Sequence, residues 1–307
     1  MSETKKTGQT VQTTGHAWDG DIQEYNNPIP RWWLWSFYAT VIFAIVYWIF
    51  YPAWPIGHSY TPGVMNTITY TVNGEEKTTH WNTRALLVRD MQTGEAAVKQ
   101  RKHMQEVANA SFSAILSDPK MIDFSSKIGK VLFEDNCAAC HGMGGQGVVG
   151  LFPNLVDDDW LWGGRTEDIQ NTISAGHIGF MPAFDKTFSE QQMDDVTEFV
   201  LSLSGQAKDK ERVARGKVLF TGEGGGCYYC HNQQGTGIKS VGSANLTDHI
   251  WTIADVASQK DIMAKRTRVR EVISHGVNRT MPTWKGRLSD EEIKLLTVYV
   301  YNLSGGK

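Results

Sequence analysis

The stretch GKVLFEDNCAACH, residues 129–141, decides how this chain folds, because it recurs as GKVLFTGEGGGCYYCH over residues 216–231. Each copy ends in Cys-x-x-Cys-His, and the two copies hold all four cysteines of the 307-residue chain. Two thiols at this spacing, followed directly by histidine, are the attachment signature of a c-type haem. A zinc knuckle or a thioredoxin-like redox pair shares Cys-x-x-Cys but has no reason to place histidine after it twice. The sequence therefore predicts two covalently bound haem c groups.

The ligands follow from the chemistry of this motif. The thiols form thioethers with the two haem vinyl groups, and the adjacent imidazole reaches the iron from one face. The predicted ligands are Cys137, Cys140 and His141 for haem 1, and Cys227, Cys230 and His231 for haem 2.

A second shared stretch supplies a candidate sixth iron ligand. ISAGHIGFMP recurs 100 residues later as ISHGVNRTMP, and both copies end in Met-Pro. A thioether opposite histidine gives a six-coordinate iron with a raised potential, so we expect Met181 to bind haem 1 and Met281 to bind haem 2. The alternative is that both methionines fill gaps in a core. His177 and His275 are rival ligands, but they do not occupy equivalent places in the two repeats.

Each repeat closes with a capped helix. Ser189 opens SEQQMDDVTEFVLSLSG and Ser289 opens SDEEIKLLTVYVYNLSG, each with Gln or Glu three residues later as a capping box and each ending in glycine. No run alternates with period two over a sustained length, which argues against a sheet. We therefore predict a mostly α fold, in which one N-terminal transmembrane helix is followed by two tandem class I cytochrome c-like helical domains, residues 126–205 and 206–307.

Small residues beside aromatic rings indicate where helices cross. A glycine and a phenylalanine one helical turn apart precede each haem motif and leave a gap for a crossing helix beside the ring. The residues are Gly129 and Phe133, then Gly216 and Phe220, with Phe199 and Tyr299 as the expected partners.

Groups around the irons should fix the axial imidazoles. In cytochromes c a backbone carbonyl shortly after the haem motif accepts from the ring N–H, and Pro153 in FPNL and Ala244 in SANL are placed for this role. Alanine keeps the carbonyl but lacks the rigidity of proline, so haem 2 should be the less firmly oriented. We expect Trp160, Trp162 and Trp251 in the cores of the haem pockets.

One segment can cross a bilayer. From Trp32 to Tyr51 there are 20 residues without a charge, and a helix of that length covers the roughly 30 Å hydrocarbon core. Aromatic rings gather at both ends, and Pro52 stops the helix. A buried helix of a soluble domain and a signal peptide are the alternatives, but both have shorter apolar runs. The N-terminal part thus divides into a tail, an anchor and a connector, residues 1–31, 32–54 and 55–125.

Charges beside the anchor set its direction. Lys5, Lys6 and Arg31 precede it, and no Lys or Arg occurs between Pro52 and Glu76, so the tail should be cytoplasmic and the haem domains periplasmic, on the outer side of a bacterial inner membrane. In the connector, ITYTVNGEEKTTHW has an Asn-Gly turn between β-prone arms, which predicts a hairpin, and residues 96–116 have a helical pattern.

Charge is balanced overall but not along the chain. The totals of 30 basic and 33 acidic residues give no indication of nucleic-acid binding. Residues 126–205 hold 4 basic and 12 acidic side chains, whereas residues 206–307 hold 16 and 10. We therefore expect the acidic half to receive electrons from a basic donor such as a soluble cytochrome c, with an ordinary solvated surface as the alternative.

The anchor segment YNNPIPRWWLWSFYATVIFAIVYWIFYPAWP, residues 25–55, together with two haem motifs and their Met-Pro loops, resembles the dihaem cytochrome c subunit of cbb3-type cytochrome c oxidases. The resemblance covers nearly the whole chain. It implies a proteobacterial respiratory complex with a haem-copper catalytic subunit and a monohaem cytochrome c subunit as partners. It also implies that this chain is not an enzyme on its own. Its role would be to pass electrons from the cytochrome bc complex, through soluble cytochrome c, toward the oxygen-reducing site.

Other classes stay open on the residues alone. A dihaem electron-transfer subunit of a membrane dehydrogenase shares the haems but has no reason to carry this anchor. A dihaem peroxidase or a haem-based ligand sensor needs an open or labile iron site, which the paired Met181 and Met281 oppose.

Overall fold

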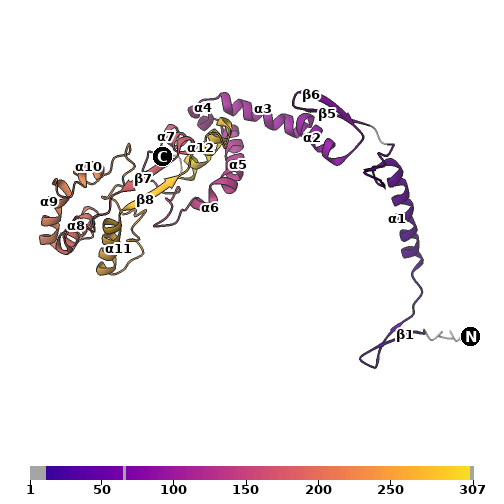
Figure 1. Ribbon diagram of the computed structural model, residues 1–307, viewed down its shortest axis with the longest axis horizontal. Coiled ribbons are helices and arrows are strands. Elements are labelled where there is room, and N and C mark those ends of the chain that lie inside the picture. The colour runs from indigo at the N-terminus through magenta and orange to yellow at the C-terminus, as the bar shows by residue number, and fades with distance from the viewer. Residues whose placement is uncertain (1–11, 65–66, 305–307) are drawn as a thin grey trace, which may run out of the picture. The chain divides into compact units, whose positions relative to one another are not determined.

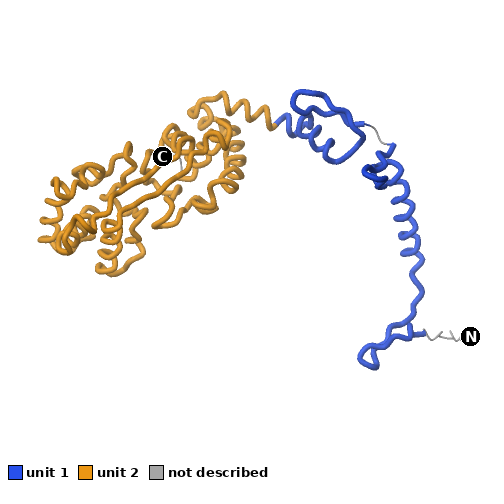
Figure 2. The backbone as a smooth tube through the Cα atoms, viewed as in Figure 1, with its two compact units in different colours: residues 1–99 blue, residues 100–307 orange. Residues whose placement is uncertain are grey.

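The computed structural model describes residues 12–64 and 67–304, and the chain separates into two compact units, residues 1–99 and 100–307 (Figure 2). The fold is mostly helical, with one apolar helix near the N-terminus and cytochrome c-like helical domains in the second unit. This confirms the predicted fold class. Lys5 and Lys6 lie outside the described residues.

Short hairpins and two helices make up the first unit. The elements are β1 (Thr13–Trp18), β2 (Ile22–Tyr25), α1 (Arg31–Phe50), β3 (Pro55–Ile56), β4 (Ser59–Tyr60), β5 (Ile68–Val72), β6 (Glu75–Thr79) and α2 (Thr83–Thr93). The pair β5–β6 is the hairpin predicted in the connector. Asn73 and Gly74 at its turn have φ of 53° and 81°, as a two-residue turn between right-twisted strands requires.

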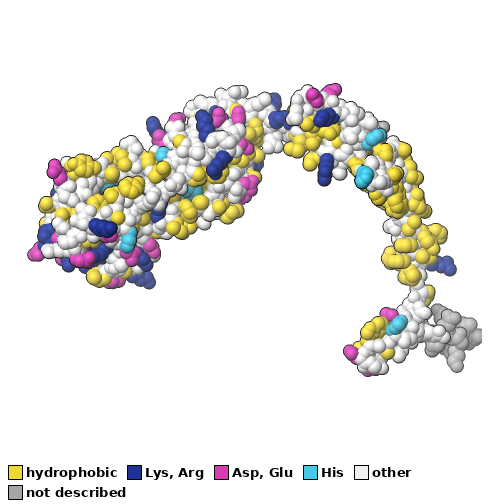
Figure 3. Space-filling view, in the orientation of Figure 1, with side chains coloured by type: hydrophobic (Ala, Val, Ile, Leu, Met, Phe, Trp, Pro, Cys, Tyr) yellow, Lys and Arg dark blue, Asp and Glu magenta, His cyan; other side chains and the backbone are white. Residues whose placement is uncertain are grey.

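Helix α1 presents apolar side chains on every face. None of its 20 residues is buried, and Pro52 follows soon after its end at Phe50. Among the described residues it is the one helix whose length and composition suit a membrane span. Figure 3 shows mainly hydrophobic side chains along its visible surface. Such an apolar surface suits the hydrocarbon core of a bilayer, where a helix satisfies most of its backbone hydrogen bonds internally.

The connector helix predicted over residues 96–116 is broken into α3 (Glu95–Asn109) and α4 (Phe112–Ser117). The side chain of Ser111 accepts a hydrogen bond from the backbone N–H of Ala114 and so begins the second helix.

The second unit contains both repeats. After α3 and α4 its elements are α5 (Pro119–Asn136), α6 (Ala138–His141), α7 (Thr166–Ala175), β7 (His177–Met181), α8 (Glu190–Leu203), α9 (Lys210–Thr221), α10 (Tyr228–His231), α11 (Ile262–His275), β8 (Val277–Met281) and α12 (Asp290–Leu303). Both predicted capping boxes are present, at Ser189 and Ser289.

The two repeats exchange their C-terminal helices. Helix α5 of the first repeat packs against α12, and α8 packs against α9 of the second repeat (Figure 1). The ring of Phe133 lies 5.4 Å from that of Tyr299, and the ring of Phe199 lies 5.1 Å from that of Phe220. All four aromatic residues therefore pack as the sequence indicates, but across the repeats. Only residues 204–209 separate α8 from α9, and such a short connection favours antiparallel neighbours.

Close glycine contacts fix both crossings. A Cβ atom on Gly129 would lie 2.6 Å from the Cβ of Tyr299, and one on Gly216 would lie 2.0 Å from the backbone oxygen of Asp195. Both are far below normal contact distance, so only glycine lets these helix pairs approach.

A two-stranded antiparallel ladder joins the repeats where they cross, so the expectation of no sheet is wrong. Strands β7 and β8 pair with His177 opposite Met281 and Met181 opposite Val277. Gly176 and Gly276, at φ of 69° and 68°, lead into the strands. A Cβ on either would lie 2.3 or 2.4 Å from the Met-Pro carbonyl of the other repeat. Strands of five residues are too short for the sustained alternation on which the expectation depended.

Two hydrophobic cores follow from the exchange. The first is built on Phe133, Ile169 and Ile173 with Ile293, Leu296 and Val300 of α12. The second is built on Phe220, Val269 and Ile273 with Met193, Val196 and Phe199 of α8. We call residues 126–176 with 281–304 the first lobe, and residues 181–276 the second lobe.

The far sides of the exchanged helices differ. On α12, Leu295 and Val298 are fully buried against Val107 and Ile115 of the connector helices. On α8 the equivalent positions carry acids, Asp195 and Glu198, which are also buried. Each acid pairs with an arginine of the second repeat, as described below.

Candidate haem-binding sites

Site 1 is formed by the first Cys-x-x-Cys-His motif. Cys137 ends α5, and the motif continues as the short helix α6. The Nδ1 of His141 lies 3.1 Å from the carbonyl oxygen of Pro153. Because a carbonyl only accepts, Nδ1 carries the proton and Nε2 keeps a lone pair for a metal. Burial lowers the pKa of His141, with the Pro153 hydrogen bond opposing it, so burial favours the neutral form that a metal ligand requires.

Site 2 repeats this arrangement around α10. The Nδ1 of His231 lies 3.0 Å from the carbonyl oxygen of Ala244, and burial lowers the pKa of His231. A hydroxyl not anticipated from the sequence holds the loop here. Ser243 Oγ donates to the carbonyl of Cys230 at 2.5 Å and accepts from the backbone N–H of Ile238 at 2.8 Å.

This serine bears on the expected difference in rigidity between the sites. Ser243 precedes Ala244 where the first repeat has Phe152 before Pro153. At site 2 the hydrogen bonds of Ser243 thus hold the loop that carries the Ala244 carbonyl, whereas at site 1 the rigid ring of Pro153 does so. The alignment of FPNL with SANL already indicates this difference, because the hydroxyl of Ser243 takes the place of the phenyl ring of Phe152.

The four cysteines are free thiols at both sites. Burial, with a smaller effect from Cys140, raises the pKa of Cys137 to about 11. Burial likewise raises the pKa of Cys227 to about 11. Within the described ranges, no group of three His, Cys, Asp or Glu side chains could hold a metal ion, whereas a structural zinc site uses four ligands.

Each predicted methionine ligand packs with the motif of the other repeat. Met281 lies against the first core, together with Cys137 and Trp160, and Met181 lies against the second core, together with Cys227. The sequence-based pairing put Met181 with His141 and Met281 with His231. In the structure the chain crosses at β7 and β8, the strands that end in Met181 and Met281, so each methionine packs beside the motif of the other repeat.

Two unpaired indole groups indicate that the cores suit a haem. Trp160 and Trp251 occupy equivalent places in the repeats, and each packs against the core of its own motif, as expected. The Nε1–H of each is buried and has no hydrogen-bond partner. Haem c carries carboxylates that can accept from such donors, and buried donors are rarely left unpaired. Free thiols, an oriented imidazole and an unpaired donor at each site therefore fit this group.

The rival histidines are engaged elsewhere. His177 stacks on Trp162, with ring centroids 3.9 Å apart, and its Nε2 lies 3.0 Å from Thr172 Oγ1. The Nδ1 of His275 donates to the carbonyl of Glu271 at 2.9 Å. Trp162 also lies against Gly242 of the second repeat, so it packs between the repeats and not inside a core of its own.

Ion pairs across the repeats cancel much of the predicted charge separation. Asp195 pairs with Arg215 at 2.7 Å, and Glu198 pairs with Arg266 at 2.6 Å. Counted by packing, the first lobe holds 6 basic and 10 acidic residues, and the second lobe holds 12 of each. Figure 3 shows both signs interleaved near α8 and α11. The acidic excess of the first lobe is thus half that of residues 126–205.

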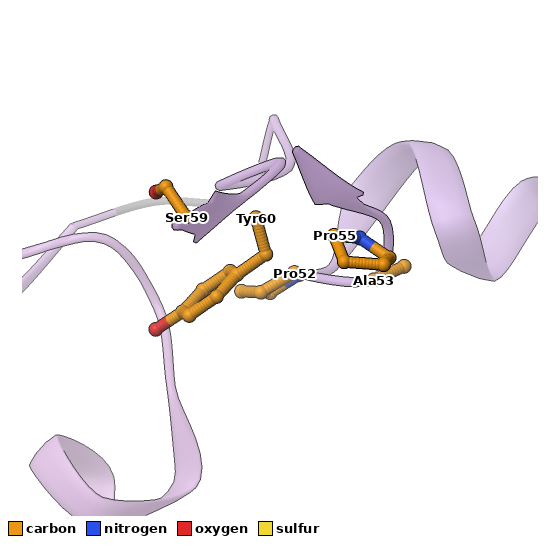
Figure 4. Close-up of a pocket in the computed structure, with 5 residues that line it drawn as sticks. All are labelled: Pro52, Ala53, Pro55, Ser59 and Tyr60. Carbon is orange, nitrogen blue, oxygen red and sulfur yellow. The ribbon is translucent and has the colours of Figure 1, made fainter. Parts of the chain in front are cut away.

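The first unit has a separate shallow hollow of about 400 Å³ beyond the end of α1. Figure 4 shows its lining, which comes from the turn after α1 and the β3–β4 hairpin: Pro52, Ala53, Pro55, Ser59 and Tyr60. Its side-chain polar groups are the hydroxyls of Ser59 and Tyr60, and no cysteine or histidine of the described residues lines it.

Comparison with known proteins gives consistent matches over both units. Residues 10–58 match the family described as the N-terminal domain of cytochrome oxidase-cbb3, FixP. Residues 125–200 and 211–300 match the family described as cytochrome c oxidase, cbb3-type, subunit III.

Full-length relatives agree with these family matches. The cbb3-type cytochrome c oxidase subunit FixP of Azorhizobium caulinodans is 41% identical, with 96% of this chain and 94% of the relative covered. Subunit CcoP of Cereibacter sphaeroides is 37% identical, with 100% and 99% covered. Subunit CcoP of an Azospirillum species is 38% identical, with 97% and 96% covered.

Proposed function

Because the chain belongs to the family of cbb3-type cytochrome c oxidase subunit III, we propose that it is the membrane-anchored dihaem subunit that carries electrons toward the oxygen-reducing subunit. The observation that carries this proposal is the equivalence of the two sites. In each, an imidazole donates through Nδ1 to a carbonyl 3.0 or 3.1 Å away and keeps Nε2 for iron.

Within each site the chain's residues hold and orient one haem c. The thiols of Cys137 and Cys140 form the thioethers at site 1, and those of Cys227 and Cys230 form them at site 2. Haem c supplies an iron that gains or loses one electron.

We propose crossed axial ligands: His141 with Met281 at site 1, and His231 with Met181 at site 2. Support comes from the packing of each methionine beside the haem cysteine of the other repeat. With histidine and methionine both bound, neither iron has a position for oxygen, so the chain alone is not an oxidase.

The partners follow from this role. Electrons come from a soluble cytochrome c or a cytochrome bc complex. They leave toward a haem-copper subunit, which is accompanied by a monohaem cytochrome c subunit.

The anchor α1 lies in the inner membrane with the N-terminus in the cytoplasm. This orientation is supported by Arg31 before the span and by the absence of Lys and Arg from Pro52 to Glu76. Both haem sites are then periplasmic. We keep residues 126–205 and 206–307 as the two domains of the sequence repeat. The two lobes, in contrast, describe which residues pack together.

Purification in mild detergent from native membranes tests the proposal. We expect a haem-copper chain and oxygen-reducing activity to co-purify, two haems per copy of this chain, and no change in its own haem spectrum on adding carbon monoxide. Purification alone or with a dehydrogenase would contradict the partners. Carbon monoxide binding to a c-type haem would contradict the axial methionines and reopen the peroxidase and sensor classes.

A further inference from the structure

Arg279 is a cation without an acidic partner at the centre of the crossing. It lies in β8 directly opposite Gly179 of β7, and it is half-buried. Its guanidinium donates to the backbone carbonyl of Gly150, and no carboxylate of the described residues pairs with it. Burial without such a partner lowers the pKa of Arg279, although arginine stays charged at any physiological pH. A half-buried charge with no carboxylate beside it is available to bind a negative group.

The register of the ladder places this charge between the two methionines. Alternate residues of a strand share a face, so Arg279 lies on the face of Met281 and, through its partner Gly179, on the face of Met181. Two residues along a strand span about 7 Å, and the diagonal to the neighbouring strand is about 8 Å. Gly179 adds no side chain to that face, so Arg279 lies at a similar distance along the ladder from Met181 and from Met281.

The repeats differ at this point in a way that packing does not explain. The equivalent of Arg279 in the first repeat is Gly179, so the chain carries one such charge and not two. The loop that accepts its hydrogen bond belongs to the first repeat, directly after the site 1 motif. Gly150 N also donates to Thr252 O of the second repeat at 3.1 Å. Arg279 is therefore held where both sites meet.

We propose that Arg279 is a positioning residue shared by the two haem sites, which meets the carboxylates of bound haem c and raises the reduction potential of both irons. The inference rests on the proposed function, because it needs two haems with ligands from the same ladder. Its physical reason is that a ferric site carries one more positive charge than a ferrous site. A fixed cation nearby therefore favours the reduced form.

A redox titration of the full-length chain in detergent, with its haems attached, tests this role. Arg279→Gln keeps a donor for the Gly150 carbonyl but removes the charge. We expect the equilibrium constant for reduction to fall about tenfold at both haems, which is about 59 mV for a one-electron couple. Arg279→Lys should keep both potentials near those of the unmodified chain. Arg268→Gln is the matched control, because it removes the same charge from an exposed pair with Glu271.

Each outcome decides a separate question. Fewer than two haems per unmodified chain would overturn the proposed function and this inference together. Two haems whose potentials fall no further in Arg279→Gln than in Arg268→Gln would overturn this inference alone. A fall at only one haem, or an equal fall in Arg279→Lys, would also overturn it, because the role requires a shared charge.

Discussion

Breaking the pair between Glu198 and Arg266 should destabilise the second lobe, although the partners lie 68 residues apart in different repeats. The Glu198 side chain is fully buried. Burial alone would raise its pKa, but hydrogen bonds from Arg266 and from the backbone N–H groups of Asp209 and Lys208 outweigh burial and lower the pKa to about 2. Relative to the usual 4.5, this corresponds to about 3 kcal/mol of stabilisation.

The assay is urea unfolding of the full-length chain in detergent, followed by the sulfur-to-iron absorption of methionine-bound haem. Glu198→Gln and Arg266→Gln should each lower the unfolding free energy by about 3 kcal/mol, since each removes the opposite charge from a buried or partly buried partner. The double variant should lose much less than the sum. Strict additivity, within about 0.5 kcal/mol, would show that the two residues do not interact and would refute the crossed packing at this point.

The same pair predicts a direction for the effect of pH. A carboxyl group whose pKa is lowered on folding contributes its stability fully above its unfolded pKa, near 4.5, and loses it as pH falls toward about 2. The unmodified chain should therefore lose more stability between those values than Glu198→Gln does. Equal losses in the two proteins would contradict the assigned cause.

Three further predictions test the exchange of helices. A chain cut after residue 205 should fail to form a folded site 1, because its core lacks α12 and Met281; a stable haem protein with methionine ligation would favour tandem domains. Gly216→Ala should destabilise the second lobe by about 1–3 kcal/mol in the same urea assay, through the clash with the Asp195 backbone, whereas wild-type stability would mean that α8 and α9 do not pack. In a variant whose site 2 cysteines are serine, Met281→Leu and not Met181→Leu should open the remaining haem to carbon monoxide; the reverse result would restore the pairing within each repeat.

Local features of this fold could be predicted from the sequence, because they depend on neighbouring residues. The haem motifs, the capping boxes at Ser189 and Ser289 and the carbonyls of Pro153 and Ala244 belong to this class. The crossing could not, because both helix interfaces present the same chemistry. In either arrangement, a glycine and a phenylalanine of one helix contact an aromatic residue of the other. The contact looks the same in the sequence whether that residue, Phe199 or Tyr299, belongs to the same repeat or to the other one.

One signal of the crossing was nevertheless in the sequence. Residues 126–205 hold 12 acids and only 4 basic side chains, so few basic partners were available there for the buried acids of α8. The basic excess of residues 206–307 supplies Arg215 and Arg266 to Asp195 and Glu198. Part of the charge difference between the two halves of the sequence is thus taken up by contacts between the repeats. Unequal charge between two repeats is a reason to ask whether their helices are exchanged.

The ladder also explains how two sites on one chain can act as a fixed pair. Met181 lies opposite Val277, four residues along β8 from Met281. At about 3.4 Å per residue, the two methionine backbones are held about 14 Å apart along the strands. In a tandem arrangement, a linker such as residues 204–209 would set this spacing and would let it vary. In the crossed arrangement, hydrogen bonds between β7 and β8 set it, and each repeat needs the other's helix to complete its core. The separation of the sites is then a property of the fold itself.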